Sequence, residues 1–467
     1  MSLSTELHLL DTPLPSPSLL TLLSNHLPYS LPVLRRLQYA ANFSSDSDNN
    51  APGTTPYSHV LFASRHSLED LVQPFGSESQ TDGKPNGQAA VGKRRHFAAA
   101  FVDLSRFPET QAWVYSTLED HCFFDPGAST AVDGPTAATT SKDAFGPQSQ
   151  SHSLPEEEAQ ECDELMLSLL RRMRTIALQM PLVLENASEQ RQKNWAEARE
   201  YLCMDAAGNK NEGPGPKVMI GSLAEIHRHR LFLDKDKGGR VHMHKTANIP
   251  EEIEWEVCQK WLFRTEALVS SSSLSSSLSS SLLSSEKEGE KEGGKLERVM
   301  REEEEGLVWD RVRTKEDVRL VQSRTSIKRQ EDTLLGLPSV AVRDGEGGSM
   351  VAWGFMAFDG TLMTLHVEVR FSFPFFLFPH NCHCRTGEGG ERKKERKRER
   401  KLTRTKQKQE QYRGKGLAKA VACKVMRDHV KDYGDDGWGA ADVFLENYRS
   451  QGVCRSIGGR VGWLLSW

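Results

Sequence analysis

The chain of 467 residues lacks a long apolar run, a strong net charge and a dense set of cysteines. No apolar segment approaches the roughly 20 residues that a membrane-spanning helix needs, which argues against a membrane partner. The formal net charge is −4, so the overall composition disfavours nucleic acid as a partner. The 8 cysteines are scattered, unlike the disulfide framework of a small secreted domain. These absences predict a soluble protein of the cytoplasm, with the nucleus as the alternative compartment.

The first block, residues 1–268, contains apolar runs separated by turn-forming residues. Strands are predicted over 57–65, 96–104 and 111–119. A helix is predicted to follow from Ser153, because acidic residues occupy its first turn and apolar side chains then recur at four-residue spacing. A second helix is predicted over 218–233, with His227 and His229 as solvated side chains rather than metal ligands. The block is therefore predicted to be a smaller α+β domain with disordered loops.

A low-complexity segment divides the chain. Residues 269–305 are rich in serine and then in glutamate, lysine and glycine, so they cannot bury a core and are predicted to be a disordered linker. Patterned sequence restarts at Gly306. Residues 306–467 are therefore predicted to be a second domain, interrupted by an unusual insert at 369–409.

The second domain has a readable order of elements. Strands are predicted over 339–343, 350–358 and 362–368. The Asp-Gly turns between them indicate an antiparallel meander. After the insert, a glycine-rich turn leads into a helix, and 441–447 is predicted to be a strand. A short helix, a turn at Gly458 and Gly459 and a final strand follow, which gives a mixed α+β sheet.

The glycine-rich turn has the form R-x-x-G-x-A at a helix start, where residues 413–418 read RGKGLA. Unpaired backbone N–H groups and the positive end of the helix dipole can cradle a phosphate or pyrophosphate at such a start. The turn is neither the Walker phosphate loop nor the G-x-G-x-x-G dinucleotide fingerprint. By itself it does not distinguish a phosphate site from a plain turn.

In this setting, residues 306–467 resemble the GNAT superfamily of acyl-CoA N-acyltransferases. The resemblance rests on the strand LMTLHVE, the loop and helix YRGKGLAKAV and the segment ENYRSQGVCRSIGG. It implies acetyl-CoA as co-substrate, with the pantetheine arm along the backbone near Val367 and Asn447 on the opposite side of a splay between strands. The residues implied at the pyrophosphate are Arg413, Gly414, Lys415, Gly416, Leu417 and Ala418. A degenerate second copy of this fold is one interpretation of the first domain.

The resemblance also implies direct transfer of the acyl group from the thioester to a primary amine of a small molecule or peptide. His366 and Glu368 are candidate bases, each with the alternative of a strand residue that faces solvent or pairs locally. Asn447 has the alternative of a turn-capping residue. The tyrosine that the family often places seven residues after the asparagine is replaced by Cys454. Ser450 or Cys454 would then be the proton donor, although a buried packing role is the favoured interpretation of the cysteine.

The insert interrupts the implied cofactor site. Removing residues 369–409 joins TLMTLHVE to EQYRGKGLAKA, the compact arrangement expected of the family. Val369-Arg370 can be encoded GTGAGA, like an intron donor, and Gln409 can end in CAG, like an acceptor. We therefore interpret the insert as a retained intron, a hypothesis that sequencing of spliced transcripts tests. Its HNCHC run has no second ligand pair at zinc-finger spacing, so no metal site is predicted.

A noncatalytic protein is the alternative function. It would be either a pseudo-enzyme whose cofactor cleft is spoiled by the insert, or an interaction protein that uses the basic run ERKKERKRERK. Such a run can act as a nuclear-targeting or nucleic-acid patch, although the interleaved Glu391, Glu395 and Glu399 dilute its charge. The acceptor amine and the acyl-chain preference cannot be read from the fold resemblance.

Overall fold

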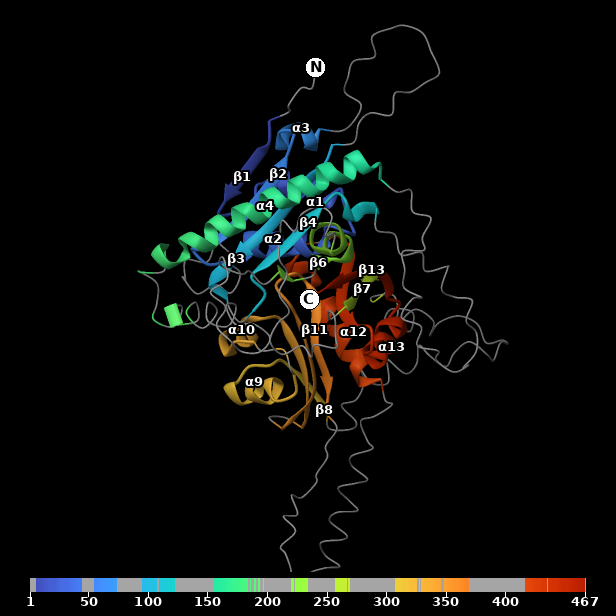
Figure 1. The fold of residues 1–467 in the computed structure, drawn as a ribbon. Helices are drawn as coiled ribbons and strands as arrows, with labels where there is room; N and C mark the ends of the chain where they lie inside the picture. The colour runs from blue at the N-terminus through green and yellow to red at the C-terminus, as the bar shows by residue number, and fades with distance from the viewer. Residues whose placement is uncertain are drawn as a thin grey trace, which may run out of the picture.

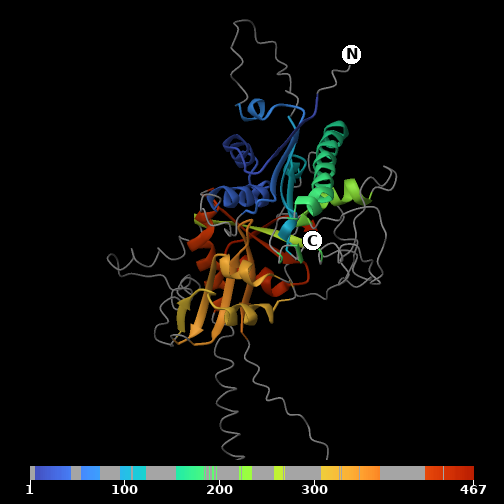
Figure 2. The same ribbon diagram turned by 90° about the vertical axis from the view of Figure 1, so that its left-hand side faces the viewer.

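Two β-sheets form the frame of the protein (Figures 1 and 2). The computed structural model describes residues 6–43, 54–73, 95–106, 109–121, 154–183, 185, 189, 192–193, 196, 220–221, 223–233, 257–266, 268, 307–325, 327, 329–345, 348–368, 416–434 and 436–466. The five-stranded sheet has the order β1-β2-β3-β4-β5, and the eight-stranded sheet has the order β6-β13-β7-β12-β11-β10-β9-β8. No helix in these ranges is long and apolar enough to span a membrane. The insert and the predicted linker lie outside the described residues.

The five-stranded sheet belongs to the first unit, which we define as the elements from β1 to β5. These elements are β1 (His8–Thr12), α1 (Pro17–Ser24), α2 (Leu31–Phe43), β2 (Ser58–Ser64), α3 (Leu68–Val72), β3 (Phe97–Asp103), β4 (Ala112–Ser116), α4 (Glu156–Val183) and β5 (Ile220–Gly221). The three strands and the long helix predicted in this region are confirmed as β2, β3, β4 and α4. Helices α1 and α2 were not predicted.

The connecting segment, residues 223–268, follows the first unit. Its elements are β6 (Leu223–Ala224), α6 (Glu225–His227), a π-helical turn (Arg228–Leu233) and β7 (Val257–Arg264). The prediction of a single helix over 218–233 is wrong, because the chain first pairs as two short strands, β5 and β6. The prediction that His227 is solvated is also wrong, since its side chain is fully buried.

The second unit comprises the elements from β8 to β13. These elements are β8 (Leu307–Asp310), α9 (Lys315–Gln322), α10 (Glu331–Gly336), β9 (Ser339–Asp344), β10 (Met350–Met356), β11 (Thr361–Val367), α12 (Leu417–His429), β12 (Trp438–Phe444), α13 (Tyr448–Ser456) and β13 (Arg460–Ser466). The predicted meander and final strand are confirmed. The strand predicted over 441–447 begins earlier and ends at Phe444, because Asn447 caps the following helix.

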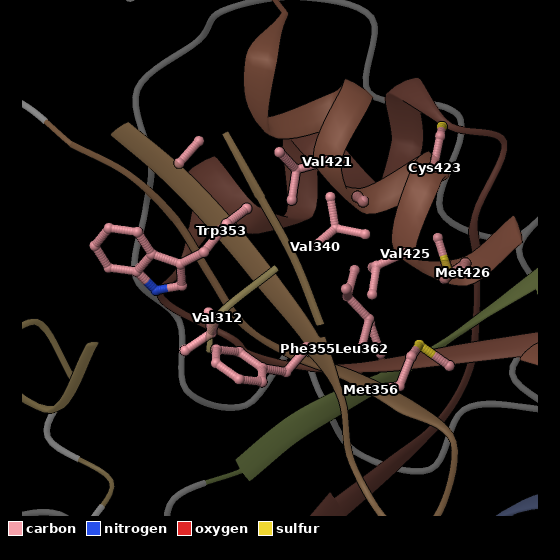
Figure 3. Packing of buried hydrophobic residues seen from close by; sticks show 14 of the residues in the cluster. Val312, Val340, Trp353, Phe355, Met356, Leu362, Val421, Cys423, Val425 and Met426 are labelled. Carbon is pink, nitrogen blue, oxygen red and sulfur yellow. The ribbon is translucent and has the colours of Figure 1, made fainter. Parts of the chain in front are cut away.

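Local sequence explains several of these elements. Helix α9 begins with a capping box in which Thr314 and Asp317 bind each other's backbone N–H groups. Gly360 has φ +67° and closes the turn between β10 and β11. Gly354 lets α12 approach β10, because an added Cβ would meet Val421 at 3.1 Å. Figure 3 shows the apolar side chains of α12 packed beside strand β10, which carries Trp353 and Phe355.

The two units share one topology. Apart from the short α3 in the first unit and from α13 and β13 in the second, each unit runs strand, two helices, three antiparallel strands and a longer helix. A strand then follows that pairs in parallel with the preceding strand. The parallel pairs are β4 with β5 and β11 with β12. The chain is therefore a tandem α+β protein in which the first unit repeats the order of the second.

Strand β7 lies before the domain boundary predicted at residue 268 but belongs to the sheet of the second unit. It lies between β12 and β13 and is antiparallel to both, and Figure 1 shows it among the red C-terminal elements. Among the described residues, both strand partners of β13, β6 and β7, come from the connecting segment. The predicted boundary at residue 268 thus separates β7 from the sheet that it completes.

Candidate active site

Strands β11 and β12 diverge inside the second unit. They pair in parallel at Thr361 with Ala440 and at Leu362 with Ala441. Beyond these pairs the two strands continue to Val367 and Phe444 without pairing with each other. Beyond Leu362, the backbone groups of β11 that face β12 have no ladder partner on that strand. This splay is the position at which a ligand with amide groups can bind to the strand edge.

A β-bulge marks the start of the splay. Trp353 pairs with His366 and Phe355 pairs with Met363, so β11 carries one extra residue opposite β10. Thr364 lies at the bulge with φ 51°, which is unusual for a β-branched residue. Because a bulge bends its strand, it turns β11 away from β12 just after their last pair.

The backbone of Val367 faces the splay. The N–H of Glu368 donates to the carbonyl of Val351 on β10 at 2.7 Å. Successive residues of a strand direct their amides to opposite neighbours, so the amide and carbonyl of Val367 point toward β12. The resemblance implied a ligand contact at the backbone of Val367, and strand β12 does not pair with that backbone.

Helix α12 is the next described element after β11, and its start is not capped by a side chain. Gly416 is the N-cap with φ +83° and makes no side-chain cap hydrogen bond. Its carbonyl accepts the N–H of Ala420, so the N–H groups of Leu417 and Ala418 precede the first intrahelical bond. Leu417 is buried and Ala418 is half-buried. Arg413, Gly414 and Lys415 lie outside the described residues.

His366 lies on β11 against an aromatic ring. Its imidazole stacks on Trp353 with ring centroids 4.7 Å apart and an interplanar angle of 25°. Its Nε2 is buried and makes no hydrogen bond within the described residues. Burial lowers the pKa of His366 from the ordinary value of 6.5, while the charge of Glu368 acts in the opposite direction. The imidazole is therefore held in its neutral, proton-accepting form.

Glu368 is engaged by a guanidinium. Arg324, just after α9, donates from Nε to Oε1 of Glu368 at 2.6 Å. The same oxygen lies 3.8 Å from Nε2 of His366. The two candidate bases thus lie together. The carboxylate of Glu368 already accepts a charge-assisted hydrogen bond, whereas Nε2 of His366 makes no hydrogen bond within the described residues.

The remaining predicted residues lie on α13, which follows β12. Oδ1 of Asn447 accepts the N–H of Ser450 at 3.1 Å, so this asparagine caps the helix. Ser450 is half-buried. Cys454 is 3% exposed, and burial raises the pKa of its thiol to about 12. Such a thiol stays protonated at neutral pH and suits a packing role.

A buried cluster lies at the end of β4, the strand of the first unit that corresponds to β11, and His227 of the connecting segment contributes to it. His227 Nε2 lies 3.3 Å from Ser116 Oγ and 3.2 Å from Glu119 Oε1, and all three residues are buried. Both contacts involve the same ring nitrogen, so this is not a nucleophilic triad. Burial raises the pKa of Glu119.

Helix α4 of the first unit also differs from α12 at its start. Its first turn carries three acidic residues, Glu156, Glu157 and Glu158. Carboxylates there oppose a pyrophosphate at the helix N-terminus. No group of three metal-binding side chains occurs among the described residues of either unit.

Several residues of this region were not identified from the sequence. Trp353, Arg324 and the bulge at Thr364 carry no motif, because their roles depend on pairing between β10 and β11 and on the loop after α9. The alternation in VCQKWLFR was a usable strand signal for β7. Because β7 lies just before the low-complexity segment, the predicted domain boundary separates it from the second sheet.

Comparison with known proteins assigns the family. The family model described as the acyl-CoA N-acyltransferase verG N-terminal domain matches residues 5–249, more than half of the chain. A search of curated proteins gives no match. A solved structure of a Drosophila protein from a structural genomics consortium has 11% sequence identity and a TM-score of 0.41, covering 99% of this chain and 97% of that chain, a likeness too low to bear on the fold. The chain belongs to the acyl-CoA N-acyltransferases, through an N-terminal domain of the verG type.

Proposed function

We propose that the second unit transfers an acetyl group from acetyl-CoA to a primary amine of a small molecule or peptide. The observation that supports this proposal best is the end of β11–β12 pairing at the Thr364 bulge. Family membership supports an acyl-CoA co-substrate in general. Acetyl as the acyl group and a primary amine as the acceptor are the finer parts of the proposal.

The residues at the splay fit an acyl-CoA. The outward amide and carbonyl of Val367 match the amide groups of a pantetheine arm. The N–H groups of Leu417 and Ala418, which precede the first intrahelical bond of α12, match a pyrophosphate. Arg413, Gly414 and Lys415 would complete this loop, and Asn447 lies at the end of β12 on the other side of the splay. The bound thioester supplies the activated acyl group.

His366 is the proposed general base. Its imidazole is half-buried, and its Nε2, which makes no hydrogen bond within the described residues, would take the proton from the attacking amine. Glu368 and Arg324 are proposed to hold that imidazole in place and to balance its charge after it gains the proton. Of the two predicted proton donors, Ser450 keeps the role here, because Ser450 is half-buried at the start of α13, whereas Cys454 is 3% exposed.

Titration calorimetry with acetyl-CoA tests the binding step. One molecule per chain is expected, because the acidic start of α4 and the buried Ser116–Glu119–His227 cluster disfavour a second site in the first unit. Gly416→Val is expected to weaken binding at least tenfold, since a β-branched residue resists φ +83°. Gly458→Val, also at positive φ but outside the proposed site, is the matched control.

A form that lacks residues 369–409 extends this experiment. Binding in that form but not in the full chain would mean that the insert blocks an intact site. Absence of binding in both forms would overturn the proposal and favour a noncatalytic protein. Salt-dependent binding of nucleic acid that maps to the basic run of the insert would favour the interaction role instead.

A further inference from the structure

We propose that Arg35 of the first unit and strand β7 of the connecting segment are positioning elements that set the width of the acyl site in the second unit. This inference rests on the proposed function, because it concerns the splay between β11 and β12. It assigns the first unit a role in substrate binding, although the buried Ser116–Glu119–His227 cluster lies at the end of its own strand β4.

Strand β7 determines where β12 lies in the splayed region. All seven residues of β12 pair with β7, from Trp438 with Arg264 to Phe444 with Cys258. On its other side, β12 pairs with β11 at two positions. A buried ion pair between Lys260 and Asp442, 2.5 Å apart, joins β7 to β12 just beyond the last β11–β12 pair. The gap therefore depends on β7, which holds the far side of β12.

Arg35 ties together the starting points of β11 and β12. Its guanidinium is 1% exposed and donates to the carbonyls of Val430 at 2.7 Å and Gly434 at 2.8 Å. It also donates to the carbonyl of Trp438 at 2.7 Å, the first residue of β12, and to the carboxylate of Asp436. One side chain thus fixes the end of α12 and the entry to β12.

The same side chain also contacts the turn that begins β11. The aliphatic stem of Arg35 lies against Gly360, where an added Cβ would come within 3.4 Å of its Cγ. Trp113 of β4 donates to Asp359 in that turn at 3.2 Å. Because the strands are paired at their starts and separate beyond Leu362, a small displacement at these starts changes the gap where the ligand would bind.

Substitution of Arg35 tests this arrangement in the full chain. Arg35→Met preserves much of the buried stem but removes the donors to Val430, Gly434 and Trp438. We expect acetyl-CoA binding to weaken about 10- to 100-fold, because such losses follow from misplacement of about 1 Å. Arg35→Lys keeps the charge without the planar fork and is expected to give an intermediate loss.

A matched control separates positioning from general loosening of the contact between the units. Glu109 accepts the N–H of Gln330 at 3.1 Å, which joins the first unit to α10 rather than to β12. Glu109→Ala, which removes this acceptor, is expected to leave acetyl-CoA binding within about twofold of the parent. In steady-state assays, Arg35→Met is expected to raise KM for acetyl-CoA and to leave KM for the amine and the pH profile unchanged.

The outcomes distinguish this inference from the proposed function. Equal acetyl-CoA affinity in the parent and in folded Arg35→Met or Arg35→Lys overturns the inference alone. If the parent binds no acetyl-CoA, the proposed function fails, and amide exchange decides whether Arg35 positions β12. In that case, faster exchange over residues 438–444 in an Arg35 variant, but not in Glu109→Ala, supports positioning, and equal exchange contradicts it.

Discussion

At the residue scale, His366 lies between an indole ring and a carboxylate that act on its pKa in opposite directions. Burial against Trp353 is the larger effect and lowers the pKa of His366, while Glu368 at 3.8 Å favours the protonated form. Because the folded-state pKa lies below the ordinary value of 6.5, the neutral form persists to lower pH. The proton-accepting form is lost as the pH falls through the folded-state pKa.

This arrangement predicts an acidic limb in kcat/KM centred below pH 6.5. His366→Gln is expected to remove that limb and to lower kcat/KM about 10²- to 10⁴-fold, as loss of a general base does. In Glu368→Gln, which removes the neighbouring charge, the limb is expected to move to still lower pH. A limb that persists unchanged in His366→Gln would exclude this residue as the base.

At the element scale, the bulge in β11 links strain to the opening of the sheet. Thr364 has φ 51°, a conformation that costs an L-residue roughly 1–2 kcal/mol. Thr361 occupies a regular, paired position in the same strand and is buried. The two threonines therefore provide a comparison within one strand between a strained and an unstrained backbone.

Replacement of each threonine by glycine is expected to have different effects. In Thr364→Gly, relief of strain offsets the entropy that glycine loses on folding, so the free energy of unfolding should change by less than about 1 kcal/mol. In Thr361→Gly, no strain is relieved, and the free energy of unfolding should fall by about 1 kcal/mol or more. Urea denaturation measures both values, and equal losses would contradict strain at the bulge.

At the scale of the whole molecule, side-chain contacts join the two units, and the sheet of the second unit takes two strands from the connecting segment. Strands β6 and β7 reach the eight-stranded sheet from the connecting segment. Tyr39 of α2 stacks on Tyr433 with ring centroids 5.0 Å apart, and the guanidinium of Arg36 lies 5.3 Å from the ring centroid of Phe358. The eight-stranded sheet is therefore incomplete without strands from before the predicted boundary at residue 268, and residues 306–467 do not form it alone.

Thermal unfolding is therefore expected to show one cooperative transition for both units. Calorimetric and van't Hoff enthalpies should agree, and circular dichroism should change together with tryptophan fluorescence. Arg35→Met should lower the free energy of unfolding by about 3–5 kcal/mol, because it leaves a buried network without its charged partner. Two separate transitions in the parent chain would show that the units unfold independently.

The sequence and the tertiary structure contributed different parts of this description. Apolar alternation and turn residues determined the meander of β9, β10 and β11, and the RGKGLA pattern located the start of α12. These signals are local, since periodicity records which face of an element is buried. The same local patterns missed the burial of His227, because its partners Ser116 and Glu119 are distant in the chain.

By itself, the sequence determined where most of the strands and helices form, and the acyl-CoA-type loop at residues 413–418 stays a prediction. The tertiary structure alone decided that β7 separates β12 from β13, that Thr364 forms the bulge and that Arg35 ties the starts of β11 and β12. The physical reason is that a strand's pattern specifies its buried face but not its neighbour. Its neighbour is chosen when hydrogen bonds and packing are completed across the whole sheet.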